Sequence, residues 1–252
     1  MNLSIVGYGA CMIAGYPLAG DAGFLQRAVP TLEQSGQYKV ALDIVPMGGF
    51  PAARARKHFA KKVLARRPDI VLLQFGSTDA SAPLRRAFLL RRLLRKDPHV
   101  REQVSTASPS STDLLKWRLR SLASDLLCVT PTSPLEEYLN AVCGMADEAR
   151  LAGCSVVMLS PFVMGGTRSN RFARYYTLAL ALQADRLTDV YFLDAHALLS
   201  GFPRREMLLR DGFHLSPRAH EELAAALGRL LAQVAQDHFR RPRVSVDVKA
   251  AS

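Results

Sequence analysis

The chain has 252 residues, 49% of them hydrophobic, and a formal net charge of +11 at pH 7. This length suits one large α/β domain or a domain that carries an insertion. Residues 1–6 lack the basic segment and long apolar stretch of a signal peptide, and no run reaches the roughly 18 apolar residues of a membrane span. We therefore expect a cytoplasmic protein.

Cysteine spacing and charge narrow the function classes further. The four cysteines show no C-x-x-C pair, which argues against a zinc site or a redox dithiol, so we expect no metal and no cofactor. The positive charge favours attraction to acidic surfaces such as phospholipid, nucleic acid or anionic glycan. An arginine-rich composition from a GC-rich genome explains the same charge equally well.

Short apolar runs alternate with helical patterns along the chain. The expected strands are residues 3–7, 39–45, 70–75, 155–160 and 190–193, and the expected helices are 52–65, 134–152, 169–187 and 217–236. Strands that are apolar at nearly every position are typical of a parallel sheet covered on both faces. The alternation predicts a three-layer, doubly wound α/β/α sandwich with a five-stranded parallel sheet.

Residues 81–134 interrupt this alternation, and we interpret them as a basic helical insertion after the third strand. The run 85–96 reads RRAFLLRRLLRK, which could lie on an anionic membrane or dock an acidic substrate. The simpler alternative packs its leucines on the core. Nucleic-acid binding is disfavoured, because the insertion lacks interleaved aromatic residues. The main domain is expected over 1–238, and residues 239–252 are expected to form a mobile basic tail.

The residues with catalytic potential lie where strands end or where the last helix begins. Asp211 precedes His214 by three residues, just ahead of that helix, and a carboxylate can hold an imidazole in the tautomer that a general base needs. Cys11 follows the first strand, and Gly49 and Thr78 follow the second and third. Ligands bind at the carboxyl ends of parallel strands, so these residues are expected to meet at one edge of the sheet.

Four motifs occur in a familiar order: Gly9-Ala10-Cys11 with Gly15, Gly48-Gly49, Gly76-Ser77-Thr78-Asp79, and Asp211 with His214. Together they resemble the SGNH hydrolases, also called the GDSL family. The resemblance covers about four-fifths of the chain and leaves out residues 81–134. It implies a small flavodoxin-like α/β/α sandwich and an ester hydrolase or acyl-transfer enzyme.

The chain departs from the family pattern at the positions that matter for chemistry. Cys11 stands where the family has its nucleophilic serine, Ala10 where it has aspartate, and Thr78 where it has the oxyanion-hole asparagine. A thiolate is a strong nucleophile, and an adjacent histidine favours it. A free cysteine is otherwise commonly a small buried hydrophobe. Asp79 is expected to brace its turn by accepting backbone hydrogen bonds.

The resemblance assigns a role to each site residue. Cys11 would be the nucleophile, His214 the general base, and Asp211 the residue that orients His214. The oxyanion would be held by the N–H groups of Cys11 and Gly49, with Gly48 as the alternative, and by the Thr78 hydroxyl. The implied substrate is an acyl or acetyl ester of a lipid or carbohydrate. The second hypothesis is a catalytically inactive protein of this fold that binds a glycan, lipid or protein partner.

Overall fold

The computed structural model describes residues 1–18, 22–34, 36–81, 119, 130–163 and 166–241. Five parallel strands form one sheet in the order β2-β1-β3-β4-β5. They are β1 (Asn2–Gly9), β2 (Lys39–Pro46), β3 (Ile70–Gln74), β4 (Ser155–Leu159) and β5 (Val190–Leu193). Every strand lies within two residues of its predicted bounds, and the predicted five-stranded parallel sheet is confirmed.

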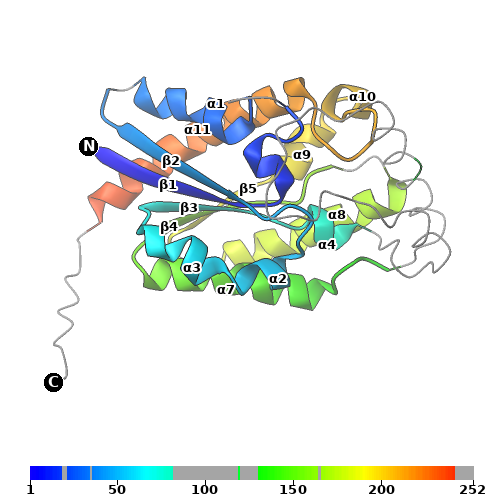
Figure 1. Cartoon of the computed structure of the whole chain (residues 1–252), viewed down its shortest axis with the longest axis horizontal. Coiled ribbons are helices and arrows are strands. Elements are labelled where there is room, and N and C mark those ends of the chain that lie inside the picture. Colours follow the sequence, from blue (N-terminus) through cyan, green and yellow to red (C-terminus); the bar gives the residue numbers. More distant parts are fainter. Residues whose placement is uncertain (19–21, 35, 82–118, 120–129, 164–165, 242–252) are drawn as a thin grey trace.

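Helices cover both faces of the sheet (Figure 1). One layer contains α1 (Phe24–Glu33), α9 (Ala195–Ser200), α10 (Arg204–Met207) and α11 (Pro217–Arg240). The other contains α2 (Ala52–Arg56), α3 (Phe59–Lys62), α7 (Leu135–Leu151) and α8 (Thr167–Ala184). The short α4 (Ser77–Ala80) and the 3-10 turns η1 (Cys11–Ala14) and η2 (Leu64–Arg66) complete the described elements. The arrangement is the predicted α/β/α sandwich.

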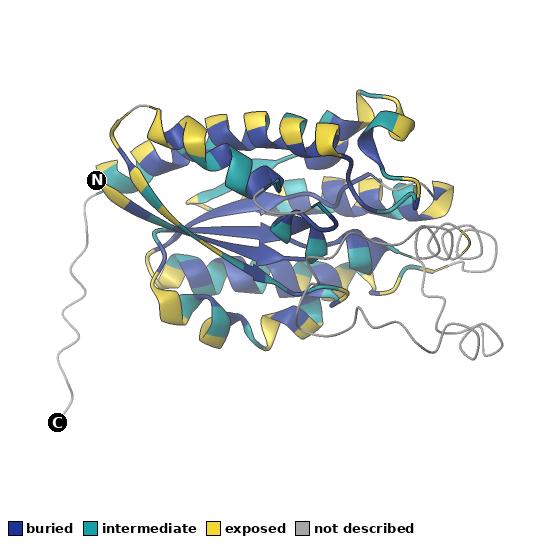
Figure 2. Cartoon of the chain, turned by 45° about the horizontal axis from the view of Figure 1, so that its top comes forward, coloured by how far each residue is buried: buried dark blue, intermediate teal, exposed yellow. Residues whose placement is uncertain are grey.

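Burial follows the position of each strand in the sheet (Figure 2). All positions of β3 and β4 are buried, whereas in β2, at the sheet edge, exposed and partly buried positions alternate from Lys39 to Ile44 and only Val45 is buried. Within β3, Ile70 and Leu72 join the core under α1 and α11, while Val71 and Leu73 join the core under α7. Each fully buried aliphatic side chain contributes about 1.5–3 kcal/mol of transfer free energy, so both layers are held firmly to the sheet.

The helix predicted over 52–65 is wrong as one element, because it is divided into α2, α3 and η2. The division begins at the Ala55 carbonyl, which accepts the Tyr8 hydroxyl at 2.7 Å and the His58 N–H at 2.9 Å. The His58 bond spans only three residues, so the backbone tightens there instead of continuing the α-helical ladder.

The last helix extends two residues past the predicted end of the domain at 238. Phe239 stacks on Tyr38 with ring centroids 5.8 Å apart, and Arg241 pairs with Asp189 at 2.8 Å. These contacts fix residues 239–241, which were expected in a mobile tail; residues 242–252 lie outside the described part of the chain.

The described residues on either side of the predicted insertion lie next to each other. Residues 82–118 and 120–129, which include the basic run 85–96, lie outside the described residues. The Thr132 N–H donates to the carbonyl oxygens of Ser81 and Asp79, both at 2.9 Å, so the two described ends are joined. Within the part of the chain that the structure describes, no helix is long and apolar enough to cross a bilayer.

Candidate active site

Cys11 is the first residue of η1, immediately beyond the carboxyl end of β1. The N–H of Ala10 donates to the carbonyl of Gln74 at 2.9 Å, which continues the pairing of β1 with β3 up to the cysteine. Gly15 ends η1 with φ of 80°, and a Cβ there would lie 2.7 Å from the Gly23 backbone. The turn that presents Cys11 is therefore fixed at both ends, and the cysteine itself is half-buried.

His214 lies in a tight loop between α10 and α11. Leu208 and Leu215 form an antiparallel bridge across the base of this loop, and the N–H of Leu209 donates to the carbonyl of His214 at 2.8 Å. Ser216 then caps α11, where its hydroxyl accepts the Ala219 N–H at 3.2 Å. The loop is consequently anchored on both sides of the histidine.

The structure brings Cys11, His214 and Asp211 into one hydrogen-bonded chain. The Cys11 Sγ lies 3.6 Å from His214 Nε2, and His214 Nδ1 lies 2.6 Å from Asp211 Oδ2. The other carboxylate oxygen, Oδ1, accepts the N–H groups of Phe213 and His214 at 2.8 and 3.0 Å. Asp211 is fully buried, so its orientation and that of the imidazole are set by the loop.

The charges and hydrogen bonds around His214 favour the protonated, positively charged form of its imidazole. Burial opposes the charged form of His214, but the hydrogen bond to Asp211 and the nearby Cys11 outweigh it and raise the pKa to about 9. Burial alone would raise the pKa of Asp211, yet the bond to His214 and the two N–H groups lower it. The charged ring therefore faces the Cys11 sulfur through Nε2.

Gly49 and Thr78 follow β2 and β3, which are the two neighbours of β1 in the sheet. Gly9, at the end of β1, lies opposite Pro46 of β2 and Gln74 of β3. Gly49 is exposed, with φ of 71°, in the turn after β2, and Thr78 is half-buried in α4, after β3. Both residues therefore follow strand ends next to Cys11, at the carboxyl edge of the sheet.

Asp79 has a different environment from the site residues. It is fully buried, and its carboxylate accepts the Ala52 N–H at 3.1 Å and the Ser133 hydroxyl at 2.8 Å. Burial raises its pKa. Its contacts reach beyond its own turn and join the start of α2 to the segment before α7, which makes Asp79 a structural tie.

Comparisons with known proteins add the fold relationship. No protein-family model matches the chain, and a search of curated proteins finds no match. Among solved structures, TesA superposes with a TM-score of 0.59 and 14% identity, over 92% of this chain and 99% of that one. A lipase/acylhydrolase from Enterococcus faecalis gives 0.57 and 18%, over 92% and 96%. The acetylxylan esterase Axe2 from Geobacillus stearothermophilus gives 0.59 and 17%, over 90% and 93%. The chain has the fold of the SGNH hydrolases.

The neighbours with this SGNH fold include a protein of the G-D-S-L family from Desulfitobacterium hafniense, at a TM-score of 0.56 and 14% identity. In Axe2, a serine and a histidine have each been replaced by alanine in catalytic mutants. In the present chain Cys11 lies in the turn after the first strand, and its sulfur contacts His214.

Two residues near the candidate site were not identified from the sequence. Tyr16 packs its ring edge-on against His214, with centroids 5.1 Å apart. Gln74 is fully buried at the end of β3, and neither atom of its side-chain amide has a hydrogen-bond partner among the described residues. Gln74 could have been noticed as the one polar residue in an otherwise apolar strand, whereas the Tyr16 contact depends on the tertiary fold.

A second serine–histidine–aspartate chain lies at the opposite edge of the SGNH sheet. His238 Nδ1 is 2.9 Å from the Ser155 hydroxyl, and its Nε2 is 3.5 Å from Asp69. Ser155 is fully buried, so a substrate cannot reach its oxygen. This cluster ties the end of α11 to the start of β4 and is structural.

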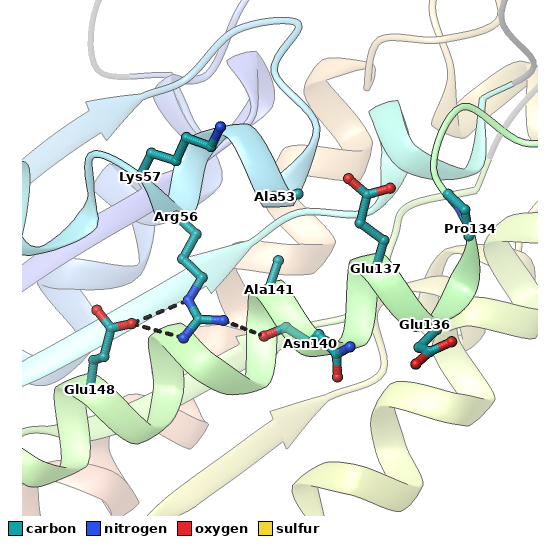
Figure 3. Close-up of a pocket in the computed structure, with 9 residues that line it drawn as sticks. All are labelled: Ala53, Arg56, Lys57, Pro134, Glu136, Glu137, Asn140, Ala141 and Glu148. Carbon is teal, nitrogen blue, oxygen red and sulfur yellow. Dashed lines mark hydrogen bonds and ion pairs between the residues drawn. The ribbon is translucent and has the colours of Figure 1, made fainter.

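A groove of about 670 Å³ lies between α2 and α7 (Figure 3). Lys57 and Glu137 stand at its sides, and Arg56 spans it to reach Glu148 at 3.1 Å. The residues that line it include neither Cys11 nor His214. Among the described residues, no group of three or more His, Cys, Asp or Glu side chains could hold a metal ion.

Proposed function

We propose that the protein is an SGNH-type ester hydrolase or acyl-transfer enzyme that uses a Cys-His-Asp triad. The observation that carries the proposal is the continuous chain from Cys11 Sγ through His214 to the buried Asp211. The neighbours that share the fold include a lipase/acylhydrolase and an acetylxylan esterase, which supports an ester substrate. The proposed substrate is an acyl or acetyl ester of a lipid or carbohydrate.

In the first half of the reaction, the Cys11 thiolate attacks the ester carbonyl carbon. The N–H groups of Cys11 and Gly49, together with the Thr78 hydroxyl, stabilise the oxyanion. When the tetrahedral intermediate collapses, the C–O bond to the alcohol breaks, and His214 donates its Nε2 proton to the leaving alkoxide. The products are an acyl-thioester on Cys11 and a free alcohol.

In the second half, a water molecule or an acceptor alcohol attacks the thioester. His214, now neutral, takes the proton of the nucleophile, and the C–S bond breaks to return the thiolate. Asp211 accepts the hydrogen bond from His214 Nδ1–H throughout, which keeps Nε2 directed at Cys11. Water yields the free acid, and an acceptor alcohol yields a new ester.

The test is a comparison of Cys11→Ala and Cys11→Ser with the wild-type protein on short-chain p-nitrophenyl esters. Cys11→Ala should abolish turnover. Cys11→Ser should preserve or increase it, because His214 and Asp211 can activate a hydroxyl, and a smaller atom leaves only a small gap. Labelling of the wild-type protein by a thiol-directed probe, and of Cys11→Ser by a fluorophosphonate, would locate the nucleophile.

The alternative role predicts a different outcome from the same experiment. If wild type, Cys11→Ala and Cys11→Ser hydrolyse the esters at the same background rate, Cys11 is not a nucleophile. The replacement of the family asparagine by Thr78 would then mark an inactive SGNH fold that binds a glycan, lipid or protein partner.

A further inference from the structure

The outer face of α8 carries an apolar stripe that no described residue covers. Tyr175, Leu178 and Leu182 are 57%, 57% and 64% exposed. Spacings of three and four residues place them on one side of the helix. The opposite side, which includes Tyr176 and Leu180, is buried in the core under the sheet. The helix is therefore apolar on both faces, although only one of them contacts the protein.

Positive charge accompanies the stripe. Arg171 and Arg174 are exposed, and each lies one helical turn before a stripe residue, Tyr175 and Leu178 respectively. The sequence of α8 contains no aspartate or glutamate. Among the described residues, the exposed acidic side chains beyond its ends include Asp185 and Asp189, after its last residue, and Glu136 and Glu137, at the start of the neighbouring α7. Apolar and cationic groups thus share one surface.

Charge decides between the candidate occupants. A second copy of the chain that docked through the same stripe would bring two arginine-bearing surfaces together. The chain's own segment 85–96 contains five arginines and a lysine, so it would also be repelled. The occupant must supply negative charge together with an apolar interior, and it must fit a convex helix surface rather than a groove.

We propose that this face of α8 binds the surface of an anionic phospholipid bilayer. Leu178 and Leu182 enter the boundary between head groups and acyl chains, and the Tyr175 ring lies at head-group level with its hydroxyl in water. Arg171 and Arg174 pair with lipid phosphates. This combination of an apolar stripe and flanking arginines is typical of helices that lie in a membrane interface.

The first turn of α8 lies at the edge of the sheet that carries the candidate site. The helix begins at Thr167, after the carboxyl end of β4, and it contacts α4, which holds Thr78. Its first turn is therefore at the same edge of the sheet as Cys11. Binding to a bilayer would bring that edge close to esters in the membrane, but the binding itself does not depend on whether Cys11 is active.

The experiment measures sedimentation of the full-length protein with vesicles of phosphatidylcholine, alone or with about 30% phosphatidylglycerol. We expect binding to the mixed vesicles only, weakened by salt. Leu178→Ser/Leu182→Ser should abolish it, and Arg171→Ala/Arg174→Ala should weaken it by roughly tenfold or more at low salt, since each arginine near an anionic surface is worth about a fivefold change. Hydrolysis of a soluble ester by these variants should not change.

Two matched controls separate the stripe from general hydrophobicity and general charge. Leu151, at the end of α7, is 90% exposed, and Arg229 is exposed on α11 in the other helix layer. Leu151→Ser and Arg229→Ala should bind vesicles like wild type. Equal binding to neutral vesicles, or equal losses in the controls, would overturn the proposal. So would a dimer in sedimentation velocity that Leu178→Ser/Leu182→Ser converts to monomer, because the stripe would then be a self-association surface.

Discussion

The charge on His214 should make the stability of the protein depend on pH in a defined window. The pKa of this histidine is about 9 in the folded protein and about 6.5 in an unfolded chain. Because the folded value is the higher one, the stabilisation is fully present below pH 6.5 and is lost as the pH rises to 9. Within that window the folded state binds one more proton than the unfolded state.

The magnitude follows from the width of the window. Each pH unit removes about 1.4 kcal/mol from the free energy of unfolding, so the whole window amounts to about 3 kcal/mol. Between about pH 7 and about pH 8.5 the loss should be about 2 kcal/mol. Burial also raises the pKa of Cys143 and Cys154 in the folded protein. At higher pH the titration of these two thiols therefore contributes to any further loss of the free energy of unfolding.

Asp211→Asn is the perturbation that isolates this effect. The carboxylate lies 2.6 Å from His214, and its hydrogen bond is the largest of the contributions that raise the pKa of the buried ring. An amide there removes the negative charge, and burial then lowers the histidine pKa, because only the contribution of Cys11 still opposes it. The variant should be less stable than wild type at pH 7, and its free energy of unfolding should hardly change up to about pH 8.5.

Urea unfolding followed by far-UV circular dichroism, at several pH values across this window, measures the difference. Asp211→Asn/His214→Gln serves as the control and should be as insensitive to pH as the single variant. If the wild-type and Asp211→Asn curves run parallel, the histidine is not charged by Asp211, and the electrostatic reasoning about the triad is wrong.

Three further outcomes are expected. Iodoacetamide should alkylate Cys11 faster than Cys154, because burial raises the pKa of Cys154 to about 11. His214→Ala should slow the alkylation of Cys11, since the histidine lies against its sulfur. Equal rates for Cys11 and Cys154, measured by peptide mass spectrometry, would exclude a reactive thiolate at Cys11. Thr78→Asn should increase kcat on short esters by up to about 10²–10³-fold by adding an oxyanion donor, and an unchanged kcat would mean that the site has another geometry. Gln74→Met should raise the free energy of unfolding by about 1–3 kcal/mol in urea titrations, because the buried amide has no partner in the described part of the chain; a decrease would show that the amide is hydrogen-bonded in solution.

The sheet could be predicted from the sequence because its strands are short, apolar and rich in branched side chains. The helices were less predictable where tertiary contacts override local pattern. Helix α1 was not predicted, since it begins at a glycine cap and contains Pro30. It forms because Phe24, Leu25 and Leu32 are buried in the core that it shares with α11, which outweighs the missing backbone hydrogen bond.

The candidate site could be anticipated because the carboxyl ends of parallel strands converge. That rule places Cys11, Gly49 and Thr78 on one edge without any knowledge of their contacts. The sequence does not reveal that Tyr16 packs on His214, because the ring contact depends on the path of the chain after η1. Nor can it reveal that a turn shortens α2, because the Tyr8 hydroxyl comes from a strand 47 residues away.

The two described ends of the insertion meet, and this bears on how its length affects the stability of the domain. Ser81 and Thr132 are held together by hydrogen bonds, and the buried Asp79 fastens the segment before α7 from beneath. The fold of the domain therefore holds the two ends of the intervening segment together. The entropy of closing such a loop grows only with the logarithm of its length, by about 0.6 kcal/mol for each doubling. The sequence between these two residues can lengthen, shorten or be exchanged for another module at little cost to the sheet and to Cys11 and His214.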